Sequence, residues 1–463
     1  MQTWRIHILG AMAGLLLAVS PAAADVAVGE IGNVLDKFSI GMDLNLFYRY
    51  DSNPYYGAPI GGAHNSTKTQ TQWGEIYTTL RLTAEKDFGW AKTKAQFAPF
   101  YTQTIGTDAY GIAKDQGDLQ VDQAWMRFGE IYGGPFSLTL GRQNIRLENW
   151  LVVAGGGEKQ DQALWLNFHG SFPFAVRLDG DFGKLTSTLF WARSNNYAKK
   201  WDETFKVGPK KDVELAGLNL HYNFNEGNYV FGGAYRKFDN STKTIDYTGE
   251  YLDGVVAGGN DTLAYDLGTH LTLGGLVVEA EGVLQKGSAG TLNGIDRDRD
   301  AFGGFASLTY NLPVAYSPYL RCSYFYFSGE DKPGDNKARD YDPMFSGFAS
   351  WNRFVIGEVT GELHLPNSNK KSTLIEAGFS PAENVAVSLH YLQHKLDKNY
   401  YLYTPTSSDD WSQEVNLFVD VPINKNLFAH VGTGVGIPGD AAEEIMGRDK
   451  NDFFAQVWLK YSF

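Results

Sequence analysis

The chain has few cysteines, few long apolar runs and few basic residues, and each shortage excludes a class of protein. Cys322 is its only cysteine, so no disulfide can form within the chain. No apolar run after residue 24 reaches the ~20 residues that a membrane-spanning helix needs. Lysine and arginine number 40 against 53 aspartates and glutamates. With no basic stripe in the sequence, we expect no nucleic-acid partner.

The first 24 residues predict a secretory signal peptide. Arg5 supplies a positive start, and a short apolar run follows from Ile8 to Val19. Ala22 and Ala24 form a small-x-small site, so cleavage is expected between Ala24 and Asp25. A buried N-terminal helix is the alternative. Loss of Arg5 would change the net charge from −13 to −14, and residues 25–463 would form a single exported domain.

The last residues predict a membrane-facing strand. Phe453, Val457 and Phe463 lie on one face of an extended chain, and Gln456 and Lys460 lie on the other. One face suits lipid and the other a wet interior. In a soluble protein such a long apolar strand would be a hazardous unpaired edge.

Alternation of this kind recurs along the whole chain, with 14% aromatic residues and 52 glycines for girdles and tight turns. A membrane protein without spanning helices must satisfy its backbone hydrogen bonds between strands, which requires a closed barrel. We therefore predict an all-β fold, a transmembrane antiparallel β-barrel of eighteen strands, with sixteen as the alternative. The strands are expected at 38–50, 73–88, 90–104, 118–131, 135–146, 161–169, 184–194, 212–224, 228–238, 262–273, 275–286, 300–311, 317–328, 370–380, 384–395, 411–421, 426–437 and 453–463.

Short and long connections alternate between these strands, as periplasmic turns and external loops do in outer-membrane barrels. With the N-terminus in the periplasm, every long link falls outside, including 51–72, 147–160, 287–299 and 438–452. Two places disturb the pattern. Segment 170–183 is long for a periplasmic turn. The strand-like stretch from Phe354 to Leu365 lies in a large external loop, about 329–369, which we expect to fold toward the pore.

A barrel of this size encloses an aqueous lumen unless loops fill it, and charged rings set ion preference in pores. Strand parity places charged side chains of both signs on the inner face, whereas Leu276, Val278 and Leu284 face outward. The pore-lining candidates are Arg49, Arg81, Arg127, Arg321, Asp43, Glu75, Glu85, Glu279, Glu281, Glu414 and Asp420. The constriction-loop candidates are Asp342, Arg353, Glu358 and Glu362.

Three motifs resemble the alginate export family of outer-membrane porins: Leu140-Gly141-Arg142-Gln143, Tyr341 to Phe345, and the ending from Val431 to Phe463. The resemblance implies an eighteen-stranded barrel that passes a polyanionic polysaccharide through an arginine-rich pore, with Arg142 as the motif arginine. Parity would point Arg142 outward, so a bulge near Gly141 is needed to turn it inward. Because many predicted inward residues are acidic and would repel a polyanion, we expect a general pore with weak selectivity or cation preference.

No other pattern predicts a cofactor, a metal or a catalytic centre. His390 and His394 would lie ~13 Å apart on a strand, so they do not form a metal-binding pair. The run from Asp296 to Asp300 lacks the spacing of a calcium loop and predicts a solvated, self-neutralised loop. The expected function is a passive outer-membrane channel for a hydrophilic solute or polysaccharide, in contact with lipid. The alternatives are the sheath of a conduit with a periplasmic partner protein and an outer-membrane hydrolase.

Overall fold

The structure is a computed structural model of the chain. It describes residues 26–31, 35–58, 70–107, 117–155, 163, 165–166, 170–194, 213–239, 244–245, 251–252, 256–292, 294–332, 334–345, 357–365, 367–401 and 404–463. The signal peptide predicted at 1–24 lies outside the described residues.

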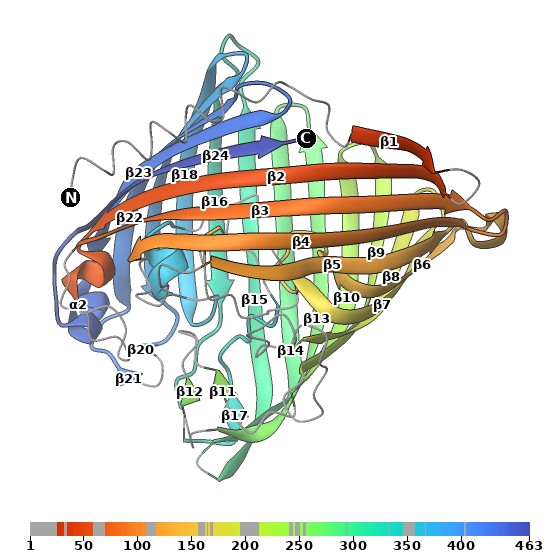
Figure 1. Ribbon diagram of the computed structural model, residues 1–463. Helices are drawn as coiled ribbons and strands as arrows, with labels where there is room; N and C mark the ends of the chain where they lie inside the picture. The colour runs from red at the N-terminus through yellow and green to blue at the C-terminus, as the bar shows by residue number, and fades with distance from the viewer. Residues whose placement is uncertain are drawn as a thin grey trace.

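Eighteen antiparallel strands form a closed barrel, which confirms the predicted fold and strand number. Each strand pairs with its neighbours in sequence, and β2 pairs with both β3 and β24, so the sheet closes on itself (Figure 1). The barrel strands are β2 (Leu35–Ser52), β3 (Gln70–Asp87), β4 (Lys92–Thr107), β5 (Gly117–Gly129), β6 (Phe136–Asn144), β7 (Ser171–Asp181), β8 (Leu185–Ser194), β9 (Val213–Asn225), β10 (Asn228–Asp239), β13 (Val256–Leu273), β14 (Leu276–Leu292), β15 (Ile295–Asn311), β16 (Tyr319–Phe327), β18 (Lys370–Ala382), β19 (Val385–Leu396), β22 (Asp410–Pro422), β23 (Leu427–Pro438) and β24 (Asp452–Ser462).

The outer surface of the barrel is apolar because alternate residues of each strand point away from the lumen. Leu218 and Leu220 of β9 are 42% and 44% exposed, whereas Asn219 between them is 5% exposed. The same alternation holds for Val457 against Gln456 in β24. An exposed apolar band of this kind is the surface that contacts lipid.

The remaining elements lie at the strand ends. β1 (Val26–Ile31) pairs with the start of β2, next to the chain's C-terminus (Figure 1). The short elements are η1 (Pro54–Gly57), η2 (Ile131–Gly133), β11 (Thr244–Ile245), β12 (Tyr251–Leu252), β17 (Lys337–Ala338), the π-helical turn η3 (Thr360–His364), β20 (Tyr400–Tyr401), β21 (Thr404–Pro405) and α2 (Asp440–Met446). No helix among the described residues is both long enough and apolar enough to cross a membrane. We call the end of the barrel that carries residues 88–91 and 226–227 the short-turn end, and the opposite end the long-loop end.

The strand predicted at 161–169 is wrong, and the wall strand in that place is β7 at Ser171–Asp181. Of the stretch 161–169 the structure describes Ala163, Trp165 and Leu166, and all three are buried outside any strand. The apolar residues that looked like a strand instead fill the barrel interior. Segment 170–183, expected as a long periplasmic turn, instead contains β7, although Pro173 within that strand cannot donate to a strand ladder.

The predicted link at 287–299 is also wrong in length, because β14 and β15 continue to Leu292 and Ile295 as an extended hairpin. The stretch from Phe354 to Leu365 is not part of the wall, as predicted, since β16 pairs directly with β18. The described part of that stretch forms η3 and its flanks, and its side chains contact inner-face residues of the barrel.

Candidate functional site

Three stretches from the long-loop end fold into the barrel, and we name them by their residues. The first inward segment is 145–155 with Ala163, Trp165 and Leu166; the second is 328–345; the constriction segment is 357–365. Together they contact inner-face residues of β2, β3, β9, β14 and β22.

The first inward segment has one apolar face and one polar face. Ile145, Leu147 and Leu151 are buried against inner-wall residues that include Phe190 and Phe325. The alternate positions carry Arg146, Glu148 and Trp150, and Arg146 is exposed. The Arg146 guanidinium lies 4.7 Å from the centroid of the Trp150 ring. The apolar face therefore packs on apolar residues of the inner wall, and the alternate positions carry polar side chains and Trp150.

Polar contacts hold this segment across the barrel. Asn149 Nδ2 donates to Glu281 Oε2 on β14 at 2.8 Å. Glu148 accepts from Asn219 Nδ2 at 2.6 Å and contacts His221 Nδ1 at 3.1 Å, both on β9. The chain thus leaves β6, reaches β9 and β14, and returns to β7.

Glu75 on β3 binds the far part of the same segment. Its carboxylate accepts the backbone N–H groups of Trp165 at 3.1 Å and Leu166 at 2.8 Å. The Trp73 indole N–H also donates to it, at 3.0 Å. Glu75 is 1% exposed, and these three donors engage both of its carboxylate oxygens.

The second inward segment is clamped at Asp342. Gln285 on β14 donates to the Asp342 carbonyl at 2.7 Å and accepts its N–H at 2.9 Å. The Lys237 ammonium lies 2.9 Å from the Asp342 carboxylate. Burial raises the pKa of Asp342, but Lys237 and Arg299 outweigh it, so the pKa lies below its ordinary value. A parallel bridge between Val153 and Phe345 joins the second segment to the first.

The constriction segment is held by Glu414 on β22. This carboxylate accepts the backbone N–H groups of Glu358 at 2.5 Å, Val359 at 3.1 Å and Thr360 at 3.0 Å. The Thr360 hydroxyl lies 2.7 Å from the hydroxyl of Ser412, two residues before Glu414. A wall side chain therefore supplies the acceptors that this tight turn cannot provide for its own backbone donors.

Arg49 on β2 contacts the wall and two of the inward stretches. Its guanidinium pairs with Asp51 at 2.8 Å and with Glu358 of the constriction segment at 2.9 Å. The same group lies 3.9 Å from the ring centroid of Trp165 in the first segment and 4.4 Å from that of Phe454 on β24. Arg49 is fully buried, and its contacts connect two inward stretches to the barrel wall.

The other predicted inner-face residues lie on the wall in pairs of opposite charge. Asp43 pairs with Arg81, Glu85 with Lys94, and Arg321 with Glu376 at 2.9 Å. Two further acidic candidates each contact a histidine on the wall. His270 contacts Glu279 at 3.0 Å and His430 contacts Asp420 at 2.7 Å. Arg127 is exposed and borders a recess of about 630 Å³ at the short-turn end. The role of these residues in conduction stays a prediction.

Arg142 points inward, and the bulge anticipated near Gly141 is present. The β6–β7 register shifts between Gly141 and Gln143, and Gly141 has φ +114°. A Cβ at position 141 would stand 2.5 Å from the Ala124 carbonyl oxygen, so glycine is required there. Arg142 is 1% exposed and its Nε donates to the Asp122 carbonyl at 2.9 Å.

The constriction-loop candidates fall in different parts of the large loop. Arg353 lies outside the described residues, and Glu362 lies within η3. Asp342 and Glu358 are both buried and both contact wall residues, Lys237 and Arg49.

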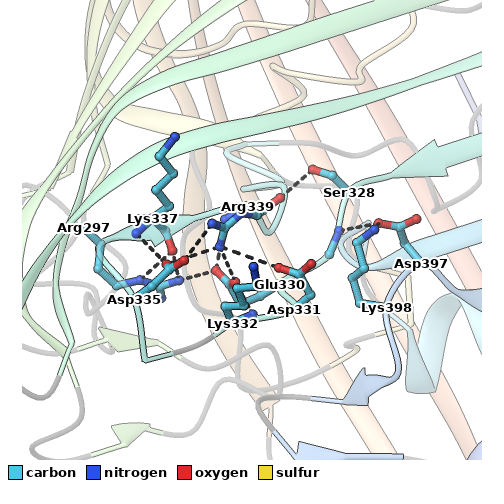
Figure 2. A network of polar contacts seen from close by, with 11 residues as sticks. Arg297, Ser328, Glu330, Asp331, Lys332, Asp335, Lys337, Arg339, Asp397 and Lys398 are labelled. Carbon is cyan, nitrogen blue, oxygen red and sulfur yellow. Dashed lines mark hydrogen bonds and ion pairs between the residues drawn. The ribbon is translucent and has the colours of Figure 1, made fainter.

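The run from Asp296 to Asp300 is not the self-neutralised loop that its alternating charges predicted. It forms the start of β15, where Arg297 and Arg299 are buried and the three aspartates are exposed. Arg297 pairs with Glu330 of the second inward segment, and Glu330 also pairs with Arg339 at 3.0 Å (Figure 2). The arginines therefore bind a loop distant in sequence and not their neighbouring aspartates.

Sequence reasoning missed Arg146, Glu148, Asn149, Trp165 and His364, which all lie in inward stretches. These residues follow no strand pattern, so parity says nothing about them. Among the described residues, no group of three or more histidine, cysteine or acidic side chains has the geometry to hold a metal ion.

A closed barrel with loop stretches held inside it is the arrangement to compare with known proteins. The family model for alginate export matches residues 75–456. The chain belongs to the alginate export family. No curated protein matches the sequence. Solved structures similar to this family member include the Pseudomonas aeruginosa porin OccK9 (OpdG), at TM-score 0.57 and 12% identity, covering 94% of this chain and 99% of that one.

Two further similar structures come from other species. Acinetobacter baumannii OccAB1 has TM-score 0.56 and 11% identity and covers 96% of this chain and 99% of its own. A BenF-like porin from Pseudomonas fluorescens Pf-5 has TM-score 0.56 and 10% identity and covers 93% of this chain and 98% of its own. At these identities the likeness concerns the fold alone, and the family assignment rests on the sequence model.

Proposed function

We propose that this outer-membrane channel passes small hydrophilic solutes passively through a constriction made by its inward stretches. The observation that carries the proposal is the set of wall side chains that hold those stretches inside the barrel. Glu75, Arg49 and Glu414 contact loop backbone or loop side chains at hydrogen-bond distance and are at most 1% exposed. Loops fixed in the lumen narrow it reproducibly, which a solute filter requires.

The charge pattern supports weak selectivity or cation preference over passage of a polyanion. Inner-face arginines such as Arg81 and Arg321 are each paired with a carboxylate, which reduces their field. A polyanion such as alginate would meet little net positive charge on this wall.

Planar bilayers test the proposal through reversal potentials in a salt gradient. We expect stepwise conductance with weak selectivity or cation preference. A variant without residues 329–369 should give larger steps, because two of the inward stretches are removed. Asn369 N donates to Ser328 O at 3.1 Å, so a short Asn-Gly link can join β16 to β18 without strain.

Two outcomes would contradict the proposed channel for small hydrophilic solutes. Strong anion preference would favour the polyanion over the general solute. Pure folded protein without steps, before and after the deletion, would end the open-channel assignment.

The orientation and processing of the chain form part of the same proposal. We place the short-turn end and the N-terminus in the periplasm, with cleavage after Ala24, because external loops are the longer ones in such barrels. N-terminal sequencing of the exported protein tests the cleavage site. Protease treatment of intact cells should cut links at the long-loop end alone.

The two alternatives have less support. A hydrolase would need an accessible Ser–His pair, yet the contact between Ser372 and His394 Nδ1 at 2.8 Å joins two fully buried side chains. A sheath around a partner needs the space that the inward stretches fill. A periplasmic partner outside the lumen stays a prediction that stoichiometric co-purification would test.

A further inference from the structure

His364 sits in the constriction segment in a setting that suits only its neutral form. The imidazole is 3% exposed, and neither ring nitrogen has a hydrogen-bond partner in the described structure. Its ring lies 4.6 Å from the Tyr56 ring centroid and 5.1 Å from that of Tyr55, both in η1. An imidazolium placed there would be desolvated and without a counter-charge.

The groups around His364 on the other elements do not offer that counter-charge. On β18, the Lys370 ammonium donates to the carbonyl of the next residue, Leu365, at 3.0 Å. On β19, His394 is fully buried and its Nε2 has no partner. Added positive charge at His364 would therefore face an ammonium and a second imidazole.

Three of the four carboxylates of this region are engaged with other groups, and Asp452 is the fourth. Glu414 accepts three backbone N–H groups of the constriction segment and the amide of Asn416 at 2.7 Å. Asp51 and Glu358 pair with Arg49. Asp452 on β24 is fully buried near the Arg49 group. Neither ring nitrogen of His364 has one of these carboxylates as a hydrogen-bond partner, so protonation of the ring has no local compensation.

We propose that acid releases the constriction segment from the barrel wall, with His364 as the proton sensor and a wider channel as the result. In the released state the imidazole is hydrated and titrates as an ordinary histidine. In the docked state it must stay neutral. The segment lies in the chain between β16 and β18, which pair directly with each other, so its release breaks no pairing of the barrel wall.

The direction of the pH effect follows from the difference between the His364 pKa values in the docked and released states. Burial lowers the pKa of docked His364 to about 3, against 6.5 when released. Docking is therefore fully favoured above pH 6.5 and becomes weaker as the pH falls toward 3. The ratio of released to docked channels rises at most about tenfold per pH unit, or about 100-fold from pH 6.5 to 4.5.

Conductance measured at pH 7.5 and 4.5 tests the proposal in planar bilayers. Acid should increase the share of large steps in the wild type, and His364→Phe, which keeps an aromatic ring between the two tyrosines, should abolish the increase. His270→Phe is the control, since this histidine pairs with Glu279 on the wall and touches no inward stretch. An equal acid response in His364→Phe would overturn the proposal.

A disulfide lock gives a second test. The Thr360 and Ser412 hydroxyls are 2.7 Å apart, so cysteines at both positions, with Cys322→Ser, can tie the segment to β22. The oxidised variant should show no acid response, and reduction should restore it. An acid response that persists in the oxidised form would place the sensor elsewhere and refute the mechanism.

A readout without conductance separates this proposal from the channel function on which it rests. Val359 is fully buried in the segment. The probe is 4,4′-dithiodipyridine, which reacts with thiols in acid, applied to a Val359→Cys, Cys322→Ser protein. After division by the rate of a free thiol at the same pH, labelling of the cysteine at position 359 should be up to about 100-fold faster at pH 4.5 than at pH 6.5. Unchanged labelling refutes the release even if the protein conducts. Faster labelling in a protein that never conducts supports the release and contradicts the channel.

Discussion

At the scale of single residues, two wall carboxylates perform the same task on different strands. Glu75 accepts two backbone N–H groups of the first inward segment, and Glu414 accepts three of the constriction segment. Irregular backbone inside a barrel leaves donors without strand partners, and a buried unpaired N–H costs free energy. A carboxylate satisfies several such donors at once because both oxygens accept, and the hydrogen bonds are charge-assisted.

Replacement of Glu414 by glutamine should therefore loosen the constriction segment. The amide has one acceptor oxygen, and its NH₂ group would face backbone donors. We expect a loss of about 1–3 kcal/mol in docking, seen as more frequent large conductance steps. Asp420→Asn is the matched control on the same strand, because Asp420 pairs with His430 and contacts no inward stretch. Identical step distributions for the two variants would contradict the role given to Glu414.

At the scale of elements, the extended hairpin of β14 and β15 carries a charged network at the long-loop end (Figure 2). Arg297 on β15 binds Glu330, which binds Arg339, which binds Asp335 at 2.7 Å. The network joins a wall strand to the start of the second inward segment. It fixes where that segment enters the barrel.

Asp335 should titrate far below an ordinary aspartate. The hydrogen bond from Arg339 and the backbone N–H of Lys337 lower its pKa from 3.8 to about 2. Because the folded-state pKa is depressed, the interaction is fully present above about pH 4 and is lost as the pH falls through 2. Carboxyl-carbon NMR should show this midpoint. In Arg339→Gln it should return toward 3.8, and an unchanged midpoint would assign the shift to another group.

At the scale of the whole molecule, closure depends on the last residue. Met42 N donates to Phe463 O at 2.9 Å, and Phe463 N donates to Met42 O at 3.0 Å. β1 pairs with the preceding residues of β2, from Ile40 back to Leu35. β2 is thus paired along both edges, and the barrel has no open seam at the short-turn end.

Removal of Phe463 should weaken the barrel by about 1–3 kcal/mol, because two backbone hydrogen bonds are lost. Urea unfolding in the presence of lipid vesicles measures the change. Phe463→Ala is the control, since it keeps both backbone bonds and removes only the ring. An equal loss in Phe463→Ala and in the deletion would show that the side chain, and not the two backbone bonds, matters.

Prediction from sequence succeeded where residues alternate between two solvents. Lipid outside and polar groups inside impose a period of two, so seventeen of the eighteen strands could be recognised from the chain and only 161–169 was misplaced. The inner-face parity of Arg49, Glu75 and Glu414 could be read in the same way. Trp165 and Leu166 show the limit of this reasoning: both are buried although they are consecutive, because loop and wall surround them on all sides.

The sequence by itself determined the barrel, its strand number and the large loop between β16 and β18, since each depends on local alternation and spacing. Only the tertiary structure decided which groups hold the loops in the lumen. Arg49 and Glu358 are 309 residues apart, and Glu75 and Leu166 are 91 apart. No local rule relates residues at such separations, because the closure of the barrel is what brings them together.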